Sequence, residues 1–171
     1  MVSEPGWTRG GLTISRQALA VVEDAAKRAY ARDEEACGYL EGPKALTLVC
    51  DRAIELENLA NKYHRADPEG HPRTGREYFK INGVKFERAI DLAATEQRAV
   101  KVFFHSHLDC GAYFSKEDAA SMTMDGQAGP TYPLAYLVTA VDLGQVTAHK
   151  LFVFDWDSRS FQESSFTTQD G

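Results

Sequence analysis

Two histidines end an apolar, strand-like run, and a carboxylate follows them at the start of a predicted helix. The segment from Val102 to Asp118 reads VFFHSHLDCGAYFSKED. In a β-strand, residues i and i+2 point to the same face, so His105 and His107 can converge on one point. On a following helix, Ser115 and Asp118 are three residues apart and share a face. Two imidazoles and one carboxylate are the protein ligands of an open catalytic zinc site, in which water takes the fourth position.

Each of these residues also has a purely structural explanation. Ser115 and Asp118 fit the helix-start pattern S/T-x-x-D/E, in which each side chain bonds the backbone of the other residue. His105 and His107 could each be a core histidine at a strand end. Two buried imidazoles on one strand face would, however, leave polar groups unsatisfied in the absence of a metal or other partners, which favours the metal site.

Composition is that of an ordinary globular protein. The 171 residues are 43% hydrophobic and 26% charged, which is enough for a single domain with a proper core. A net charge of −6 argues against a protein that grips nucleic acid. No apolar run reaches the roughly 18–20 residues of a membrane span, no signal pattern begins the chain, and three cysteines form no paired framework. We therefore expect a cytoplasmic domain over 1–171 that binds neither nucleic acid nor membrane.

Apolar periodicity and turn residues predict a mixed order of strands and helices. We predict strands over 12–14, 35–41, 46–59, 100–107, 134–141, 146–155 and 159–166, and helices over 16–31, 82–98 and 115–124. The strand over 46–59 is expected to be the antiparallel neighbour of the strand over 35–41. Residues 61–76 read as a long loop and 167–171 as a flexible tail. This order predicts an α+β fold, an α–β–α sandwich in which helices flank a central mixed sheet.

One carboxylate stands out near the start of the second predicted strand. Glu35 begins a run that is otherwise apolar, where an ionised carboxylate is costly unless it has a partner. Gly38 within the same run indicates close approach by another backbone or by a ligand. His64 and His71 lie in the polar segment 61–76, which offers no fixed scaffold, so we expect them to be solvated loop histidines and not ligands.

The pattern H-x-H-x7-S-x2-D, formed by His105, His107, Ser115 and Asp118, resembles the JAMM motif of the MPN (JAB1/MPN/Mov34) metalloprotease family. The segment Glu35–Leu40, EACGYL, resembles the E-x-C-G-x-L strand of the same family. The resemblance covers roughly residues 12–155 and implies an MPN/JAB-type domain whose core spans these residues. The compact chain is most similar to prokaryotic members.

The resemblance also implies a role for each matched residue. His105, His107 and Asp118 match the ligands of one zinc ion per chain. Glu35 matches the general acid/base, and Ser115 matches the residue that helps to stabilise the oxyanion of the tetrahedral intermediate. Zinc lowers the pKa of its bound water to about 7 and polarises the scissile carbonyl, so Glu35 need only pass a proton to the leaving amine.

The implied activity is that of a deubiquitinase-like zinc metallopeptidase or isopeptidase. Its implied partner is a ubiquitin-fold protein, either a ubiquitin-like modifier or a sulfur carrier, that is cut after its C-terminal Gly-Gly. The sequence predicts neither the type of bond nor the oligomeric state. A RadC-like protein shares the H-x-H signature, but such chains usually add a helix-hairpin-helix region and Pro-Ser-Gly after the second histidine. A non-catalytic MPN scaffold normally loses the ligands, all of which are present here.

Three positions after the second histidine call for comment. Leu108 stands where the family often has proline. Asp109 completes an H-x-H-x-D triple on one predicted strand face and is an alternative ligand to Asp118. Cys110 lies near the site and is either a competing thiolate or a partly buried loop cysteine.

Overall fold

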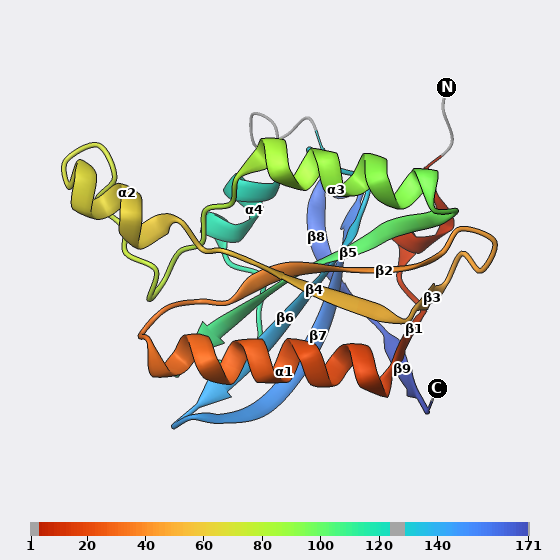
Figure 1. The fold of residues 1–171 in the computed structure, drawn as a ribbon, viewed down its shortest axis with the longest axis horizontal. Helices are drawn as coiled ribbons and strands as arrows, with labels where there is room; N and C mark the ends of the chain where they lie inside the picture. The colour runs from red at the N-terminus through yellow and green to blue at the C-terminus, as the bar shows by residue number, and fades with distance from the viewer. Residues whose placement is uncertain (1–3, 124–128, 171) are drawn as a thin grey trace.

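A six-stranded mixed sheet runs through the middle of the molecule between helices (Figure 1). The computed structural model describes residues 4–123 and 129–170. The strand order is β4-β2-β5-β6-β7-β8, in which β5 and β6 are parallel and the other neighbours are antiparallel. The strands of this sheet are β2 (Cys37–Pro43), β4 (Arg52–Leu56), β5 (Arg98–Leu108), β6 (Ala135–Asp142), β7 (Gln145–Asp155) and β8 (Ser160–Ser164). The helices are η1 (Gly6–Arg9), α1 (Arg16–Ala31), α2 (Ala60–Ala66), α3 (Gly83–Thr95) and α4 (Lys116–Met122).

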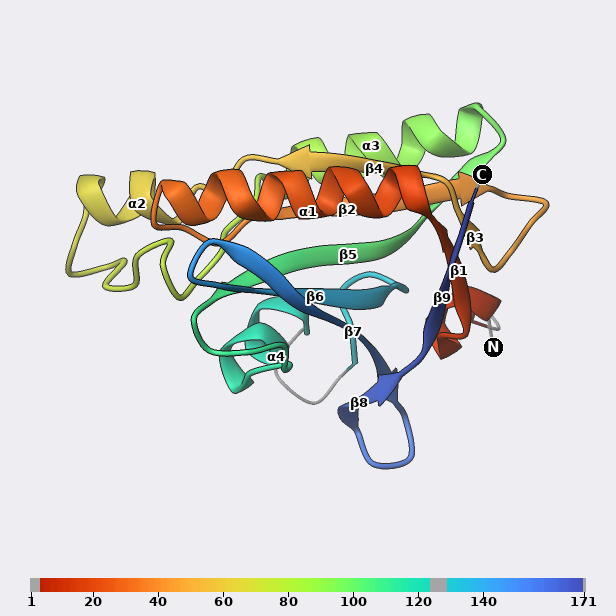
Figure 2. The ribbon, with the colours of Figure 1, turned by 90° about the horizontal axis from the view of Figure 1, so that it is seen from below.

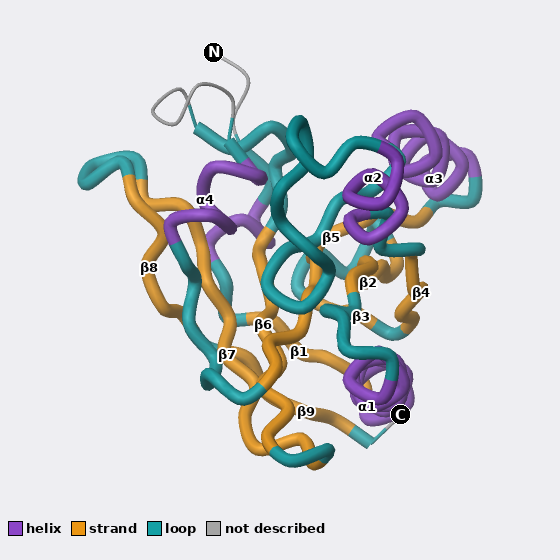
Figure 3. Tube along the Cα trace, turned by 90° about the vertical axis from the view of Figure 1, so that its left-hand side faces the viewer, coloured by secondary structure: helices purple, strands orange, loops and turns teal. Residues whose placement is uncertain are grey.

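Strand β5 is buried on both faces because its side chains alternate between two hydrophobic clusters. Val102 and Phe104 pack in the cluster that includes the inner face of α1. Phe103 points the other way and packs edge-on against Phe86 of α3, with ring centroids 5.8 Å apart. Accordingly, α1 and α3 lie on opposite sides of strands β2 and β4 (Figure 3). The predicted α+β fold, a central mixed sheet flanked by helices, is confirmed.

A second, smaller sheet lies near the two chain ends (Figure 2). Its three parallel strands, in the order β3-β1-β9, are β3 (Val49–Cys50), β1 (Leu12–Ser15) and β9 (Phe166–Gln169). The single strand predicted over 46–59 is therefore wrong, because its first half pairs with β1 and its second half with β2. The flexible tail predicted over 167–171 is also wrong for residues 167–169, which pair with β1 while Phe166 packs against the α1 cluster.

Part of the loop predicted over 61–76 is helical. Helix α2 extends from the body of the molecule at the left of Figure 1. Only Ala60 in α2 is buried, so the helix lacks the apolar repeat by which a sequence reveals a helix. His64 lies in α2, and His71 lies in the loop that follows it. His64 Nδ1 is 2.8 Å from the carbonyl oxygen of His71.

Side-chain caps fix the starts of three helices. Ser15 and Asn82 each accept a backbone N–H of the first turn at 3.1 Å, which fixes the starts of α1 and α3. Ser115 caps α4, which ends at Met122; the end predicted near Met124 lies outside the described residues. Among the helices described, none is both long enough and apolar enough to cross a membrane.

Candidate metal centre

The two histidines lie near the end of β5 and face the same point. Their side chains project from one face of the strand, as the alternation predicts, and their Nε2 atoms are 3.2 Å apart. His105 is 1% exposed and His107 is 5% exposed. The register of β5 pairs His105 with Cys37 of β2 and with Val138 of β6, so a neighbouring strand on each side fixes its position.

Asp118 brings a carboxylate to the same point from the first turn of α4. Its Oδ2 lies 3.1 Å from His105 Nε2 and 3.3 Å from His107 Nε2. The same oxygen accepts the Ser115 N–H at 2.9 Å, while Ser115 Oγ accepts the Asp118 N–H at 3.0 Å. This reciprocal capping box fixes the rotamer of the carboxylate. The helix-cap and ligand explanations of Asp118 are therefore compatible.

Glu35 lies just before β2, and the chain beside it is tied to the strand that carries the histidines. The Ala36 N–H donates to Ser106 Oγ at 2.8 Å, and the Ser106 N–H donates to the Ala36 carbonyl at 3.0 Å. Ser106 stands between the two histidines, on the opposite face of β5. The Glu35 side chain is buried, with 2% exposure of the residue, and its Oε1 has no hydrogen-bond partner among the described residues.

The donor atoms of Glu35, His105, His107 and Asp118 lie within 4.8 Å of one another and fit a metal ion. In a tetrahedral zinc site with bonds of about 2.0 Å, two ligand atoms are about 3.3 Å apart. The three separations among the histidine nitrogens and Asp118 Oδ2 are 3.1, 3.2 and 3.3 Å. A buried carboxylate oxygen without a partner also needs an explanation, and a metal with its water would supply one.

The two carboxylates of the group have opposite pKa shifts. Burial raises the pKa of Glu35 well above its ordinary value, and the charge of Asp118 raises it further. Burial acts on Asp118 in the same direction, but its pKa is lowered because the charge of His105 and the hydrogen bonds from both histidines and from the Ser115 N–H outweigh burial. Such a pair suits one ionised ligand and one group that takes up and releases a proton.

Contacts around the two histidine rings orient them, and one contact sets the tautomer of His107. His107 Nδ1 lies 3.0 Å from the carbonyl oxygen of Gly111. A carbonyl can only accept, so Nδ1 carries a proton, and in the neutral ring Nε2 keeps a lone pair for a metal. The rings of Phe79 and Phe114 pack against His105, with centroid distances of 4.8 and 6.0 Å.

The group opens into a cleft of about 500 Å³. One wall comes from the segment between α2 and α3, and the other comes from the β5–α4 connection and the start of α4. The cleft is lined by Glu35, Arg73, Arg76, Glu77, His107, Leu108, Cys110, Tyr113, Ser115, Glu117 and Asp118. No local pattern in the sequence connects Arg73 with the motif, because only the folded chain brings this residue to it.

Asp109 and Cys110 are not part of the four-residue group. The Asp109 carboxylate instead accepts the Tyr30 hydroxyl at 3.0 Å and the Leu143 N–H at 2.9 Å. Its φ is 56°, so the chain leaves the extended conformation there and breaks the strand alternation on which the H-x-H-x-D triple depends. Cys110 is exposed and lines the cleft.

Comparison with known proteins shows which family and which solved structures the chain resembles. Residues 16–154 match the family model of prokaryotic homologs of the JAB domain. A solution structure of a protein from Desulfitobacterium hafniense is similar, with a TM-score of 0.68, 20% identity and 94% of each chain covered. A solution structure from Salinibacter ruber has a TM-score of 0.58 and 22% identity over 93% of this chain and 92% of that one. A crystal structure of a JAB1/MPN domain protein from Archaeoglobus fulgidus has a TM-score of 0.52 and 17% identity, over 94% and 99%. A search of curated proteins returned no match.

Fold and site together define a JAB/MPN-type domain whose buried histidines and carboxylates are compatible with a bound metal. Because the family model covers most of the chain, the protein belongs to the prokaryotic homologs of the JAB domain. The predicted resemblance to prokaryotic members of the MPN family is thereby confirmed.

Proposed function

We propose that this protein is a zinc-dependent peptidase or isopeptidase that cuts after the C-terminal Gly-Gly of a ubiquitin-fold protein. One observation carries the peptidase part: three ligand atoms 3.1–3.3 Å apart lie beside a buried carboxylate that has no partner of its own among the described residues. Two imidazoles and one carboxylate favour zinc over magnesium or calcium, which prefer oxygen ligands. The choice of substrate rests on the resemblance of the motifs.

In this proposal His105, His107 and Asp118 hold the zinc ion. A bound zinc ion supplies Lewis acidity, which polarises the scissile carbonyl and makes a water molecule more acidic. The capping box holds Asp118, and the hydrogen bond with Gly111 orients His107, so the ligands are prearranged by the fold.

Glu35 is the group that moves the proton. A carboxylate with a raised pKa accepts a proton from the attacking water more readily than an ordinary one and can then pass it to the leaving amine. The position of Glu35 supports this role, because its side chain belongs both to the four-residue group and to the lining of the cleft.

Ser115 donates a hydrogen bond to the oxyanion. The cap uses a lone pair of Ser115 Oγ to accept the Asp118 N–H, so the hydroxyl proton stays available to donate. Ser115 also lines the cleft, where negative charge would develop on the substrate. A donor that is already oriented toward such charge lowers the barrier of the reaction.

Mass spectrometry tests the proposal. The zinc-loaded protein is incubated with ubiquitin-fold proteins whose Gly-Gly ends carry either a peptide extension or a lysine-linked peptide, and we expect one of the two to be released. Glu35→Gln should keep zinc and lose about 10²-fold or more of the rate. The matched control is Glu23→Gln, since Glu23 pairs with His149 outside the cleft. A zinc-loaded protein that released no extension would contradict the peptidase and favour a binding role.

A further inference from the structure

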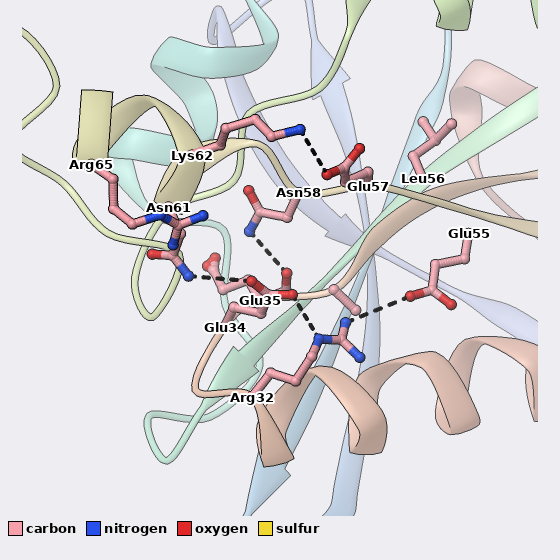
Figure 4. A pocket seen from close by; sticks show the side chains of 11 residues that line it. Arg32, Glu34, Glu35, Glu55, Leu56, Glu57, Asn58, Asn61, Lys62 and Arg65 are labelled. Carbon is pink, nitrogen blue, oxygen red and sulfur yellow. Dashed lines mark hydrogen bonds and ion pairs between the residues drawn. The ribbon is translucent and has the colours of Figure 1, made fainter. Parts of the chain in front are cut away.

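Asn58 binds the backbone of the proposed acid/base. The Glu35 carbonyl accepts a hydrogen bond from the Asn58 side-chain amide at 2.9 Å (Figure 4). The second amide N–H donates to the Tyr78 carbonyl at 3.0 Å. Asn58 Oδ1 accepts the backbone N–H groups of Ala60 and Lys80, both at 3.0 Å. All four hydrogen-bonding positions of this amide are therefore occupied.

A second tie holds Glu35 through its backbone N–H, which donates to the Gly75 carbonyl at 2.6 Å. Gly75 is fixed in turn by Asn61, whose Oδ1 accepts the Gly75 N–H at 2.7 Å and whose amide donates to Glu34 Oε2 at 3.2 Å. A Cβ at position 75 would lie 2.9 Å from Glu34 Cβ, so the close approach requires glycine. The segment that follows β4 thus bonds both backbone groups of Glu35: Asn58 donates to its carbonyl, and Gly75 accepts its N–H.

The Glu35 side chain itself lacks such an anchor. Its Oε1 makes no hydrogen bond within the described part of the chain, and the ladders of β2 begin only at Cys37. The place of the carboxylate relative to the histidines is therefore set by the backbone ties at residues 35 and 36. Two of these ties come from Asn58 and Gly75, and another comes from Ser106 of β5.

We propose that Asn58 is a positioning residue that locks the backbone of Glu35 beside the metal ligands. This inference rests on the proposed peptidase function. The network around Asn58 is partly buried and its amide is fully satisfied, so removing half of its bonds leaves polar groups unpaired. A displacement of about 1 Å at a catalytic group lowers the rate on the order of 10²-fold. No hydrogen bond of the described structure joins Asn58 to His105, His107 or Asp118, so its effect falls on proton transfer and not on metal binding.

Asn58→Asp tests the two donor bonds of the amide apart from its two acceptor bonds. The variant keeps both acceptor bonds but cannot donate, so its contacts with the Glu35 and Tyr78 carbonyls become repulsions between oxygens. We expect kcat to fall on the order of 10²-fold, with KM and the zinc affinity unchanged. Asn82→Asp is the matched control, because Asn82 caps α3 through an acceptor bond alone. A wild-type kcat in the Asn58 variant, or a loss of zinc affinity that accounts for the fall, would overturn the proposal.

Hydrogen exchange tests the tie without any variant and without any activity. In the wild-type protein, we expect both Asn58 side-chain amide protons and the Glu35 backbone amide proton to exchange far more slowly than the side-chain amide of exposed Asn82. Rapid exchange at Asn58 would overturn the positioning role, even in an active peptidase. Slow exchange in a zinc-loaded protein that cleaves nothing would instead reject the proposed function and leave the tie in place.

Discussion

Ser115 and Asp118 cap each other at the start of α4: Ser115 Oγ accepts the Asp118 N–H at 3.0 Å, and Asp118 Oδ2 accepts the Ser115 N–H at 2.9 Å. That same Oδ2 faces the Nε2 atoms of both histidines. The first turn of α4 is thus a helix cap and one side of the candidate metal centre at once. Any change that loosens the cap also loosens a proposed ligand.

Ser115→Ala should therefore lower both stability and metal affinity. Loss of an N-cap costs about 1 kcal/mol, and loss of support for a ligand costs about 10–100-fold in metal affinity or activity. Ser15→Ala is the matched control, because Ser15 caps α1 with the same kind of bond at 3.1 Å. It should lose similar stability and leave zinc affinity unchanged. Thermal melts and calorimetric zinc titrations measure the two effects, and equal zinc affinities in both variants would separate the cap from the metal centre.

Zinc should bind at one ion per chain and stabilise the folded protein. At a free concentration 100 times the Kd, a ligand specific for the folded state adds about 2.7 kcal/mol. His105→Ala should abolish this gain because it removes a ligand. His149→Ala should retain the gain, since His149 bonds Thr139 and Glu23 away from the site. Thermal melts after chelation and after return of zinc measure the stabilisation, and elemental analysis measures the number of zinc ions per chain. A wild-type melting temperature that is the same with and without zinc would reject the metal centre.

The core of the site could be predicted because its residues lie in short local patterns. The two-residue period of a strand placed His105 and His107 on one face, and the capping pattern placed Asp118 at a helix start. Glu35 required more, because its approach depends on the pairing of β2 with β5. The resemblance to a family supplied that link, which composition and periodicity do not contain.

Features that depend on distant contacts escaped prediction. Strand β9 is polar and is a strand because it pairs with β1 at the other end of the chain. Asn58 lies within the strand predicted over 46–59, and its four hydrogen bonds follow only from the folded chain. Lys101 lies in the middle of an apolar strand and is fully buried. Its charged group is tolerated there because Nζ donates to the carbonyls of Pro43, Leu46 and Val49.

Asp109→Ala should keep zinc binding and loosen the loop after β5. The Asp109 carboxylate accepts the Leu143 N–H and the Tyr30 hydroxyl, and these bonds, with the charge of Arg76, lower its pKa despite some opposing burial. The variant should therefore lose a little stability and bind zinc at the wild-type ratio. Asp118→Asn provides the contrast, because it should lose zinc. Elemental analysis of both variants decides between them: a folded Asp109→Ala protein without zinc would identify Asp109 as a ligand.

In the metal-free protein, the stability of Glu35→Gln relative to the wild type should increase as the pH rises. Burial and the charge of Asp118 raise the pKa of Glu35 above its ordinary value of 4.5 in the folded chain. A carboxyl of this kind holds its proton more tightly when folded. Its stabilising effect is therefore complete below the unfolded-state pKa and is lost as the pH rises through the folded-state pKa.

Glutamine stays neutral throughout this range, so the difference in unfolding free energy between the two proteins isolates the titration of Glu35. Urea unfolding with a chelator at about pH 4, 6 and 8 measures this difference. The change with pH is the signature, because a constant offset also contains the effect of burying an amide in place of an acid. A difference that did not vary with pH would mean that Glu35 titrates alike in the folded and unfolded chains, and its burial would then not govern its protonation.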